Sequence, residues 1–521
     1  MREAADRLRA MVDAGTCTGA AAILTDSSRA IALETFGTTR ENGDGVGVTI
    51  TERTRFRWAS CSKPVTAVAA LLAVQDGMIG LDIPIARYLP RFSVRSRFEV
   101  DSAAQITVRH LLSHMAGLTR QAPVDNSYDD WPGHVASISD TWLRFPVELR
   151  YAYSDIGVDL VGHVLEVASG VSFPELVASR VFAPLGMDDA TFDRAVVRAD
   201  ATRAIGHING NLHGLSGMVP AGSMHASARD LGRFLQFVLG GGDVDGARVL
   251  SRDLLDEMAT VPFPVAGQVE GYALGLRTRR TVRGRRLGHA GRGFGFLADM
   301  WWLPEEGIGA AAVVNSHDED IRRRIVPALL DRASAGPCDS ATAVAARSTV
   351  NTTAEPQGVS HLAGRYAGAL HQTLVFAVRD GALGRVDGDD FDPLTFLTLT
   401  DAVTHDTNER YRFMPSDARG VVAPPYVVRV RDGESWSYND GPSDPPGLDR
   451  TEWDKHVGDY TLVTRDGLTG RIPVATHNGH LYVASQRIFE DRAFLFTPRG
   501  EHVELDGDMI RVGSRTLERI V

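Results

Sequence analysis

The hydrophobic pattern of this 521-residue chain changes character near residue 335. Before that point, helix-like runs of apolar residues alternate with short strand-like runs. The predicted helices are 65–77, 106–118 and 158–170, and the predicted buried strands are 19–26 and 308–315. The first and last of these helices end at a glycine, a common stop signal. Interleaved helices and strands indicate one large mixed α+β domain over residues 1–335.

The C-terminal part of the chain has a different pattern. Residues 334–358 are small, polar and irregular, so we expect a linker at 336–358. Beyond it, short runs of alternating apolar and polar residues are separated by Gly, Asp and Pro turns, which is typical of small antiparallel sheets or barrels. The clearest runs are 373–380, 426–433, 480–485 and 493–500. We therefore predict two small antiparallel β-barrel domains, 359–446 and 447–521.

A short internal repeat supports this division into two C-terminal units. Leu-Ala-Gly-Arg-Tyr at 362–366 recurs as His-Val-Gly-Asp-Tyr at 456–460, so a glycine and a tyrosine take equivalent places in both units. The turn-rich stretch 441–450 lies between them and is the natural boundary.

Charge and cysteine content exclude several classes of protein. The net charge of −11 is unfavourable for binding nucleic acid or anionic membrane, so we expect neither as a partner. No run approaches ~18 consecutive apolar residues. Residues 1–15 are charged and helix-like, unlike a secretory signal. Three cysteines, Cys17, Cys61 and Cys338, are too few and odd in number for a disulfide framework, which fits a cytoplasmic location. We expect no cofactor.

Lysine is almost absent from the chain. Only two lysines, Lys63 and Lys455, stand against 53 arginines. Arginine stays protonated, whereas a lysine amine can be tuned to act as a base. Lys63 lies three residues after Ser60, next to the predicted helix at 65–77, so both side chains would share one helix face. Because a serine hydroxyl is a weak nucleophile without an adjacent base, we predict Ser60 as nucleophile and Lys63 as its base. Drift in composition is an adequate explanation for Lys455.

A second candidate element is Tyr153-Ser154-Asp155, which precedes a predicted helix. A phenol near a lysine ammonium loses its proton more easily and can relay a proton to a leaving group. The alternative is structural: Tyr153 packs against the helix entry and Asp155 caps the helix.

A third candidate element is His289-Ala290-Gly291, followed by Arg292 and a glycine-rich stretch. Small residues at this place would let a substrate backbone lie along a strand edge. The alternative is a glycine-rich hairpin with an incidental histidine.

Taken together, these elements make the chain resemble the serine β-lactamase superfamily, in particular its class C, D-aminopeptidase and esterase branch. That family has S-x-x-K, then Y-x-N, then K/H-x-G, in this order. Flanking segments are also similar: ITVRHLLSHMAGL (106–118), PLGMDDATF (184–192), AGSMHASARDL (221–231) and YALGL (272–276). The resemblance covers residues 1–335. It implies a β-lactamase/transpeptidase-like fold, with an antiparallel sheet flanked by helices beside a helical lobe, and with Ser60 between them.

The resemblance also implies roles for single residues. The expected catalytic residues are Ser60, Lys63, Tyr153 and His289. The expected substrate-binding residues are Asp155, Ala290, Gly291, Arg292 and Arg277. Ser60 would be acylated and then deacylated by water or another acceptor, with the oxyanion between the backbone N–H groups of Ser60 and Arg292. Arg277 follows YALGL, where related D-Ala-D-Ala carboxypeptidases carry a carboxylate-binding arginine.

The chain departs from the family at Asp155, where the family usually has Asn. One hypothesis is that an ionised Asp155 attracts a free α-amine on the acyl side of the substrate. The other is that Asp155 accepts a hydrogen bond from Lys63 and holds it in place. Elsewhere, His110 and His114 have a spacing that suits zinc, but the Glu of H-E-x-x-H is absent, so we expect a surface or capping role for both.

Three functions remain open from the sequence. A catalytic domain followed by two barrels is similar to the layout of bacterial D-aminopeptidases, which favours a serine hydrolase acting on D-amino-acid-containing peptides, amides or esters. An acyltransferase, a peptide-cyclising thioesterase of penicillin-binding-protein type, or a carboxylesterase or β-lactamase is the alternative. A catalytically silent binding protein on the same fold is the alternative of another class. The expected partners are a small-molecule or short-peptide substrate and, as an assembly, a homodimer.

Overall fold

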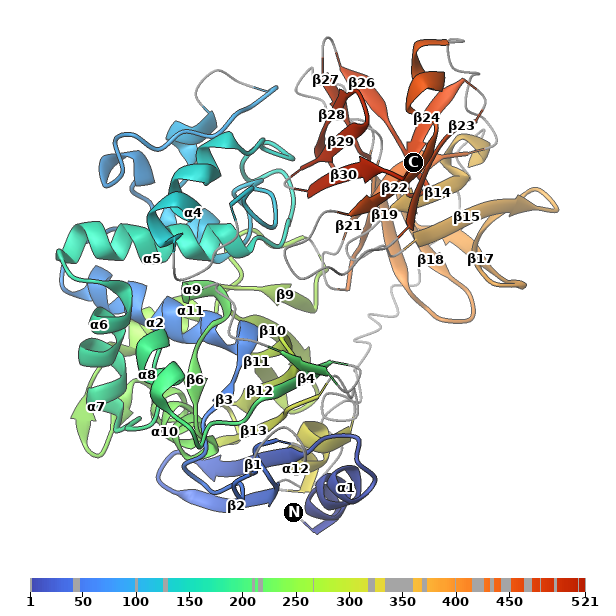
Figure 1. Cartoon of the computed structure of the whole chain (residues 1–521). Helices are drawn as coiled ribbons and strands as arrows, with labels where there is room; N and C mark the ends of the chain where they lie inside the picture. The colour runs from blue at the N-terminus through green and yellow to red at the C-terminus, as the bar shows by residue number, and fades with distance from the viewer. Residues whose placement is uncertain are drawn as a thin grey trace.

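A computed structural model shows an N-terminal α+β part followed by two all-β parts (Figure 1). The described residues are 2–40, 47–98, 102–124, 130–208, 211–213, 219–265, 267–316, 324–332, 359–367, 373–398, 400–414, 426–431, 435–441, 451–462, 471–477, 479–491, 494–513 and 515–520. The predicted linker 336–358 lies outside them. No single described helix is long and apolar enough to cross a membrane. One bent pair, Asp155–Ser169 with Phe173–Leu185, passes by length and composition only.

The N-terminal part is centred on a seven-stranded antiparallel sheet in the order β2-β1-β13-β12-β11-β10-β9. The two buried strands predicted from the sequence are confirmed as β1 (Gly19–Asp26) and β13 (Ile308–Val314), and they are neighbours. The other strands are β2 (Ala30–Gly37), β9 (Glu270–Tyr272), β10 (Arg277–Thr281), β11 (Gly284–Gly293) and β12 (Phe296–Leu303). The arginine-rich stretch 277–286 is therefore a β10–β11 hairpin at one side of this sheet.

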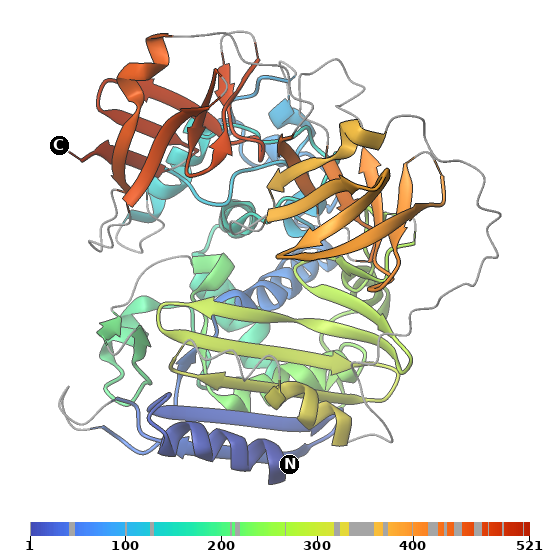
Figure 2. The same cartoon turned by 90° about the vertical axis from the view of Figure 1, so that its right-hand side faces the viewer.

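Both faces of the sheet are covered by helices. Along β1, Ala20 and Leu24 pack with α1 and α12, whereas Ala21 and Ile23 pack in the opposite core with α10. These helices are α1 (Arg2–Asp13), α10 (Ala228–Leu239) and α12 (Val326–Arg332). Burial on two faces explains why these strands are continuous apolar runs rather than alternating ones. Figure 2 shows α1 running alongside β1 and the broad face of the sheet turned to the viewer.

A helical lobe lies beside the sheet, and its residues share one hydrophobic core with the sheet face that α10 covers. The predicted helices at 65–77 and 158–170 are confirmed as α2 (Ser62–Gln75) and α5 (Asp155–Ser169). Gly170, at φ 76°, ends α5 in the left-handed conformation that glycine adopts without strain. Shorter helices complete the lobe: α3 (Val108–Leu112), α4 (Trp131–Ser137), α6 (Phe173–Val177) and α9 (Val219–Gly222).

The prediction of a helix over 106–118 is wrong in its length. α3 ends at Leu112, and Ser113 is its C-cap. The chain then turns at His114 and Gly117, which have φ of 59° and 69°. A positive φ cannot continue a right-handed helix, so the apolar residues after α3 are buried in a loop instead.

The C-terminal part forms two antiparallel sheets. β14–β21 make a closed eight-stranded barrel, whose core is filled by aromatic side chains such as Tyr366, Phe376 and Tyr411. A barrel of this size has room for little more than its own side chains. β22–β30 make a nine-stranded sheet whose edge strands, β25 (Gln486–Arg487) and β26 (Phe489–Asp491), follow each other in the chain, so this sheet nearly closes.

The bounds of the other C-terminal strands are β14 (Gly364–Ala367), β15 (Thr373–Arg379), β16 (Ala382–Asp387), β17 (Asp390–Phe396), β18 (Asp401–Thr404), β19 (Arg410–Met414), β20 (Tyr426–Arg429), β21 (Ser435–Asp440), β22 (Gly458–Leu462), β23 (Arg471–His477), β24 (His480–Val483), β27 (Phe494–Phe496), β28 (His502–Asp506), β29 (Met509–Val512) and β30 (Arg515–Arg519). The predicted domain boundaries after residues 335, 358 and 446 fall in undescribed segments and stay predictions.

The internal repeat marks the same structural place in both sheets. The Tyr366 hydroxyl donates to the carbonyl of Leu362 at 2.9 Å, and the Tyr460 hydroxyl donates to the carbonyl of His456 at 3.0 Å. Each tyrosine is on the first strand of its sheet and is buried in the core of that sheet. The repeated tyrosine therefore closes the turn that leads into each sheet.

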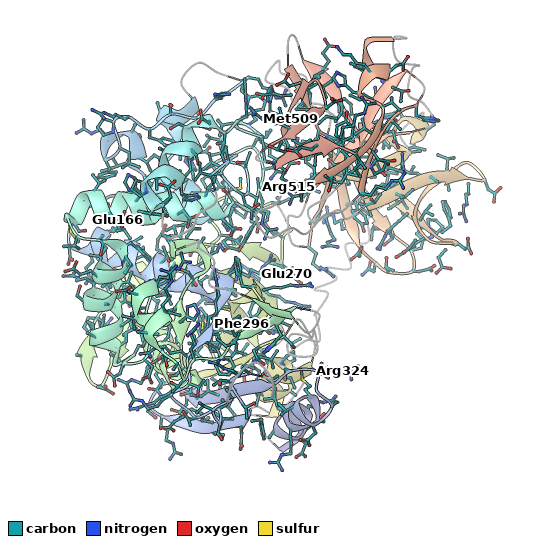
Figure 3. All side chains as sticks on the ribbon, in the orientation of Figure 1. Glu166, Glu270, Phe296, Arg324, Met509 and Arg515 are labelled. Atoms are coloured by element: carbon teal, nitrogen blue, oxygen red, sulfur yellow. The ribbon has the colours of Figure 1, made fainter. Side chains whose placement is uncertain are left out.

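The first barrel contacts the N-terminal part next to segments that lead into the site described below. The backbone N–H groups of Val269 and Glu270 donate to the carbonyl of Arg431 at 2.8 and 2.6 Å. Figure 3 labels Glu270, at the start of β9, where the two parts face each other. The buried Arg150 also donates to the hydroxyl of Ser437 at 2.9 Å. The barrel thus holds β9 and the segment that precedes α5.

Candidate active site

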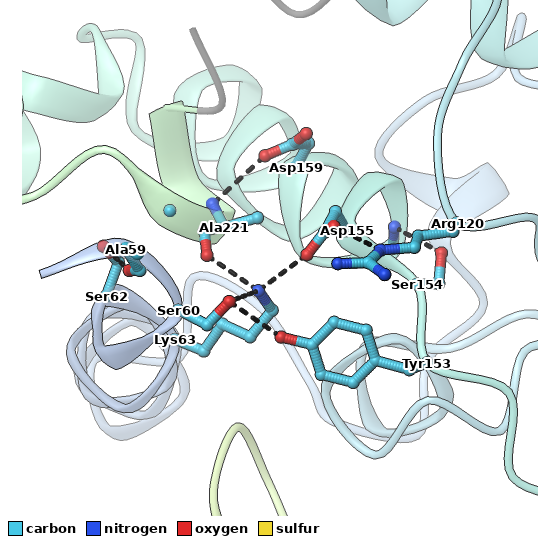
Figure 4. Close-up of polar contacts among 12 residues, drawn as sticks. Ala59, Ser60, Ser62, Lys63, Arg120, Tyr153, Ser154, Asp155, Asp159 and Ala221 are labelled. Carbon is cyan, nitrogen blue, oxygen red and sulfur yellow. Dashed lines mark hydrogen bonds and ion pairs between the residues drawn. The ribbon is translucent and has the colours of Figure 1, made fainter. Parts of the chain in front are cut away.

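Ser60 lies at the entry to α2, where the backbone is strained. It is the central residue of a short 3-10 turn, η1 (Ala59–Cys61), that runs directly into the helix. Ala59 has φ 44°, a conformation that non-glycine residues adopt rarely and at a cost. Lys63, one turn later, places its Nζ 3.1 Å from Ser60 Oγ (Figure 4). The predicted sharing of one helix face is confirmed.

The Lys63 ammonium is fully buried and has three acceptors. Besides Ser60 Oγ, its Nζ donates to Asp155 Oδ1 and to the carbonyl of Ala221, each at 2.8 Å. An ammonium has three N–H groups, so each one has a partner. Burial disfavours the charged form, but attraction by Asp155 and Tyr153 outweighs it, so the pKa of Lys63 is raised. The environment therefore keeps this lysine protonated.

Tyr153 reaches the same oxygen from the start of α5. Its hydroxyl donates to Ser60 Oγ at 2.9 Å, and Lys63 Nζ lies 4.8 Å from the centre of its ring. The helix is capped by Ser154, whose hydroxyl accepts from the N–H of Gly157, rather than by Asp155 as the structural alternative proposed. Tyr153 is thus free of a capping role and lies against the candidate nucleophile.

Asp155 is held between two cations of the chain. Its Oδ1 accepts from Lys63 at 2.8 Å and its Oδ2 accepts from Arg120 Nε at 3.2 Å (Figure 4). Burial alone would raise the pKa of this carboxyl, which is 2% exposed, but Lys63 and Arg120 outweigh burial and lower it. Both carboxylate oxygens are therefore engaged within the chain. This arrangement favours the hypothesis that Asp155 holds Lys63 over the one in which it binds a substrate amine.

The His289-Ala290-Gly291 element lies on β11, against η1. Cys61 Sγ donates to the carbonyl of His289 at 3.1 Å. A side chain at Gly291 would collide with the carbonyl of Trp58, 2.2 Å from an added Cβ, which explains the glycine. β11 thus passes directly alongside the turn that carries Ser60.

The ring of His289 is neutral and points to another tyrosine. Its Nδ1 lies 2.7 Å from the carbonyl of Ala290, which only accepts, so this nitrogen carries the proton and Nε2 accepts from the Tyr272 hydroxyl at 2.9 Å. Burial, with the charges of Lys63 and Arg277, lowers the pKa of His289 well below its usual value. The β11 backbone thus connects His289 to the turn that carries Ser60, and the His289 ring packs among neighbouring aromatic rings.

The other residues singled out by sequence have varied surroundings. Arg277 begins β10, close enough for its charge to lower the pKa of His289. Arg292 continues β11 past Gly291. His110 completes the capping box at the start of α3, as predicted. His114 does not take the expected surface or capping role: it is buried, with its ring 4.3 Å from that of Tyr153.

The described residues contain no group of three or more His, Cys, Asp or Glu side chains that could hold a metal ion. Around Ser60, the described side chains bring a hydroxyl, a phenol and an ammonium close together.

Sequence reasoning missed three parts of this site. Arg120 had no motif of its own, although it lies two residues after the similar segment 106–118. The carbonyl of Ala221 is a backbone group, and no side-chain pattern can reveal it. Behind it, the buried Asp159 accepts from the N–H of Ala221 at 3.1 Å and lies 3.2 Å from His134 Nε2. Asp159 therefore fixes the residue whose carbonyl accepts from Lys63.

Comparison with known proteins agrees with this geometry. A family model described as Beta-lactamase matches residues 4–333. Penicillin-binding protein 4 of Amycolatopsis lactamdurans is 27% identical over 52% of this chain and 74% of its own length. The D-alanyl-D-alanine-carboxypeptidase/endopeptidase AmpH of Escherichia coli K12 is 24% identical over 57% of this chain and 79% of its own length.

A solved structure, that of SurE with D-Leu, covers 84% of this chain and 99% of its own chain, with a TM-score of 0.56 and 23% identity. At this identity the likeness shows the fold. Because the family model covers well over half of the residues, the chain belongs to the beta-lactamase family and has the β-lactamase/transpeptidase-like fold of its serine hydrolases.

Proposed function

We propose that this protein is a serine hydrolase that forms an acyl-enzyme on Ser60. The observation that carries the proposal is the position of Ser60 Oγ, which lies 3.1 Å from Lys63 Nζ and 2.9 Å from the Tyr153 hydroxyl at a strained helix entry. A serine between a cation and a proton carrier can attack an acyl carbon and release its own proton. Oγ forms a bond to the acyl carbon, the bond to the leaving group breaks, and water then hydrolyses the ester.

The proton path in this proposal runs through Tyr153. Lys63 was expected to be the base, but its three acceptors and raised pKa stabilise the ammonium. A lysine held in this form acts mainly through its charge, which stabilises the negative charge that develops on Ser60 Oγ during the attack. Tyr153 then takes the Ser60 proton as it passes its own phenol proton to the leaving group, so the phenol is neutral before and after the step. The oxyanion would accept from backbone N–H groups of Ser60 and Arg292, as the family resemblance implies.

For the substrate we propose short peptides, amides or esters that contain a D-amino acid. Two observations support this class. The chain combines a catalytic part with two antiparallel barrel-like sheets, the layout that suggested a D-aminopeptidase from sequence. In addition, AmpH is named for D-alanyl-D-alanine substrates, and SurE was solved with D-Leu. The matched D- and L-substrates described below measure the stereochemical preference.

Transfer of the acyl group to an acceptor other than water stays the second candidate, because the same acyl-enzyme serves both outcomes. A silent binding protein is disfavoured by the intact contacts of Ser60 with Lys63 and Tyr153. The two enzymatic outcomes differ in the product that accumulates when an added amine competes with water.

The proposal is tested with matched D- and L-aminoacyl 4-nitroanilides and 4-nitrophenyl esters, each in free-amine and N-acetylated form. We expect turnover with the D-series preferred, little effect of acetylation because Asp155 is engaged, and no turnover in Ser60→Ala. Preference for the L-series would refute the substrate class, and turnover by Ser60→Ala would refute the acyl-enzyme. Product analysis with added D-alanine amide separates hydrolysis from acyl transfer.

A further inference from the structure

Arg120 has an unusual position at the edge of the active site. It lies in the loop after α3, and its Nε donates to Asp155 Oδ2 at 3.2 Å. Its guanidinium carbon lies 5.7 Å from the centre of the Tyr153 ring. In Figure 4 the guanidinium points from its own loop toward the group formed by Asp155, Lys63 and Tyr153. One edge of the guanidinium is thus fixed by a buried carboxylate, next to the tyrosine that contacts Ser60.

The other edge of this guanidinium is available to a ligand. The Arg120 side chain is 43% exposed, whereas Lys63 and Asp155 are buried. Within the described parts of the chain, its two terminal nitrogens have no hydrogen-bond partner. A guanidinium has five N–H groups in a planar fork that matches a carboxylate with two parallel hydrogen bonds. Its Nε contact with Asp155 therefore orients the fork and leaves its outer edge unused.

The charges around the site favour an anion rather than a cation. Asp155 carries one negative charge between the positive charges of Lys63 and Arg120. Arg277 adds a further positive charge close to His289 and His114. Local positive charge thus exceeds negative charge beside Ser60. This positive charge is opposite in sign to the negative charge that Asp155, in place of the family's Asn, suggested on its own.

We propose that Arg120 binds an anionic group of the substrate, of the carboxylate class, next to the acyl bond that Ser60 attacks. The proposal rests on the proposed function and adds a specificity-determining residue outside the three motifs. Asp155 orients Arg120 in this arrangement and does not itself bind substrate. The carboxylate can belong to the acyl part or to the leaving group, and the two sources are separable by experiment.

The competing explanation is that Arg120 only neutralises Asp155. Loss of Arg120 would then perturb Lys63 and slow every substrate alike. A ratio of kcat/KM between a charged and a neutral substrate removes such a general effect, because it cancels in the ratio. The acyl arm compares the 4-nitrophenyl monoester of adipic acid with 4-nitrophenyl hexanoate. The leaving-group arm compares hexanoyl thioglycolic acid with its methyl ester.

The variants are Arg120→Gln, Arg120→Lys and the control Arg285→Gln. Arg285 lies on β11 in the β10–β11 hairpin and has a similar exposed fraction, 39%. It forms an ion pair with Glu305. We expect the unsubstituted protein to prefer the carboxylate about tenfold to a hundredfold in one arm, as a charged hydrogen bond provides. Arg120→Gln should bring that ratio close to one, Arg120→Lys should keep part of it, and Arg285→Gln should keep all of it.

Two results would overturn the proposal: a ratio near one in both arms for the unsubstituted protein, or a ratio in Arg120→Gln that is unchanged because both substrates lose equally or not at all. If Arg120→Gln does not fold, salt titration of the unsubstituted protein replaces it. The ratio should fall as salt screens a partly exposed cation, and a ratio independent of salt contradicts the proposal. If the unsubstituted protein turns over none of these esters and Ser60 takes no acyl group, the proposed function itself fails.

Discussion

Tyrosine hydroxyls have different partners in the catalytic part and in the C-terminal sheets. In the catalytic part, Tyr153 donates to the side-chain oxygen of Ser60 and lies beside a buried ammonium. In the sheets, Tyr366 and Tyr460 each donate to a backbone carbonyl four residues earlier in the chain. The same side chain thus contacts a candidate reacting atom in one region and closes a turn in the other. Substitutions should therefore separate rate from stability between the two regions.

The two regions also differ in the free-energy cost of burying their side chains. Lys63 and Asp155 lie at 0% and 2% exposure, whereas the first barrel is filled by aromatic and aliphatic side chains. Taking an ion pair out of water carries a desolvation penalty that its attraction does not always offset. A buried pair is thus weak evidence of stabilisation. Because the pair lies beside Ser60, we infer that its main role is in catalysis.

The largest effect is expected at Lys63. We predict that Lys63→Arg and Lys63→Ala each lower kcat/KM by ~10²–10⁴-fold, the range for loss of a group that assists proton transfer. A guanidinium keeps the charge, but it is larger and planar and cannot direct three N–H groups at Ser60, Asp155 and Ala221. Steady-state kinetics on a turned-over ester tests this. Near-full activity in Lys63→Arg would show that charge alone is sufficient.

Tyr153→Phe tests the catalytic side of the comparison. We predict a loss of kcat/KM of ~10²-fold or more, since the proton path loses its carrier. The ring and its packing against Lys63 remain, so the free energy of unfolding should change by less than about 1 kcal/mol. Denaturant unfolding beside kinetics measures both. An active Tyr153→Phe enzyme would indicate that Lys63, and not Tyr153, transfers the proton.

Asp155→Asn should cost stability as well as rate. Removing one partner of a buried pair destabilises by about 3–5 kcal/mol, because the remaining charge is left uncompensated. The exposed pair Asp140 with Arg95 offers the control, and Asp140→Asn should change stability by less than about 1 kcal/mol. Equal stability of the two variants would contradict the stabilising role predicted for the buried pair.

The pH dependence of stability follows from the same pair. Asp155 has a lowered pKa when folded, so its contribution is present above the ordinary carboxyl pKa and is lost as pH falls through the folded value. Lys63 has a raised pKa, so its contribution is present below the ordinary lysine pKa and is lost as pH rises through the folded value. Unfolding from acid to alkaline pH should show both limbs, and Asp155→Asn should weaken the acid limb. An unchanged acid limb would contradict this assignment.

The smallest effect is expected in the C-terminal sheets. Tyr366→Phe and Tyr460→Phe each remove one hydroxyl from a carbonyl, which should cost about 1–2 kcal/mol of stability. Neither should change kcat/KM, because neither hydroxyl contacts the site. Thermal unfolding and kinetics on both variants test the prediction. A loss of rate in either variant would show that its sheet takes part in positioning the catalytic residues.

The fold and the motif residues were predictable because they leave local signals. The β1 and β13 strands are continuous apolar runs, and Lys63 is conspicuous in a chain with two lysines. Periodicity failed over 106–118, where positive φ angles at His114 and Gly117 end the helix early. Tertiary packing overrode the local pattern there.

The hydrogen bonds and ion pairs that connect the site residues were not predictable in the same way. Asp155 was ambiguous because its role depends on Arg120, a residue 35 positions away with no motif. The carbonyl of Ala221 and its support by Asp159 exist only in the folded chain. The sign of local charge therefore came from contacts between distant segments rather than from the substitution of Asn by Asp.

In the proposed mechanism, Ser60 carries the acyl group. Intact-mass spectrometry after a brief reaction with a slow ester or a β-lactam, followed by peptide mapping, measures this directly. We predict one added acyl group, on the peptide that contains Ser60, and no addition in Ser60→Ala. An adduct on another residue, or one that persists in Ser60→Ala, would contradict it.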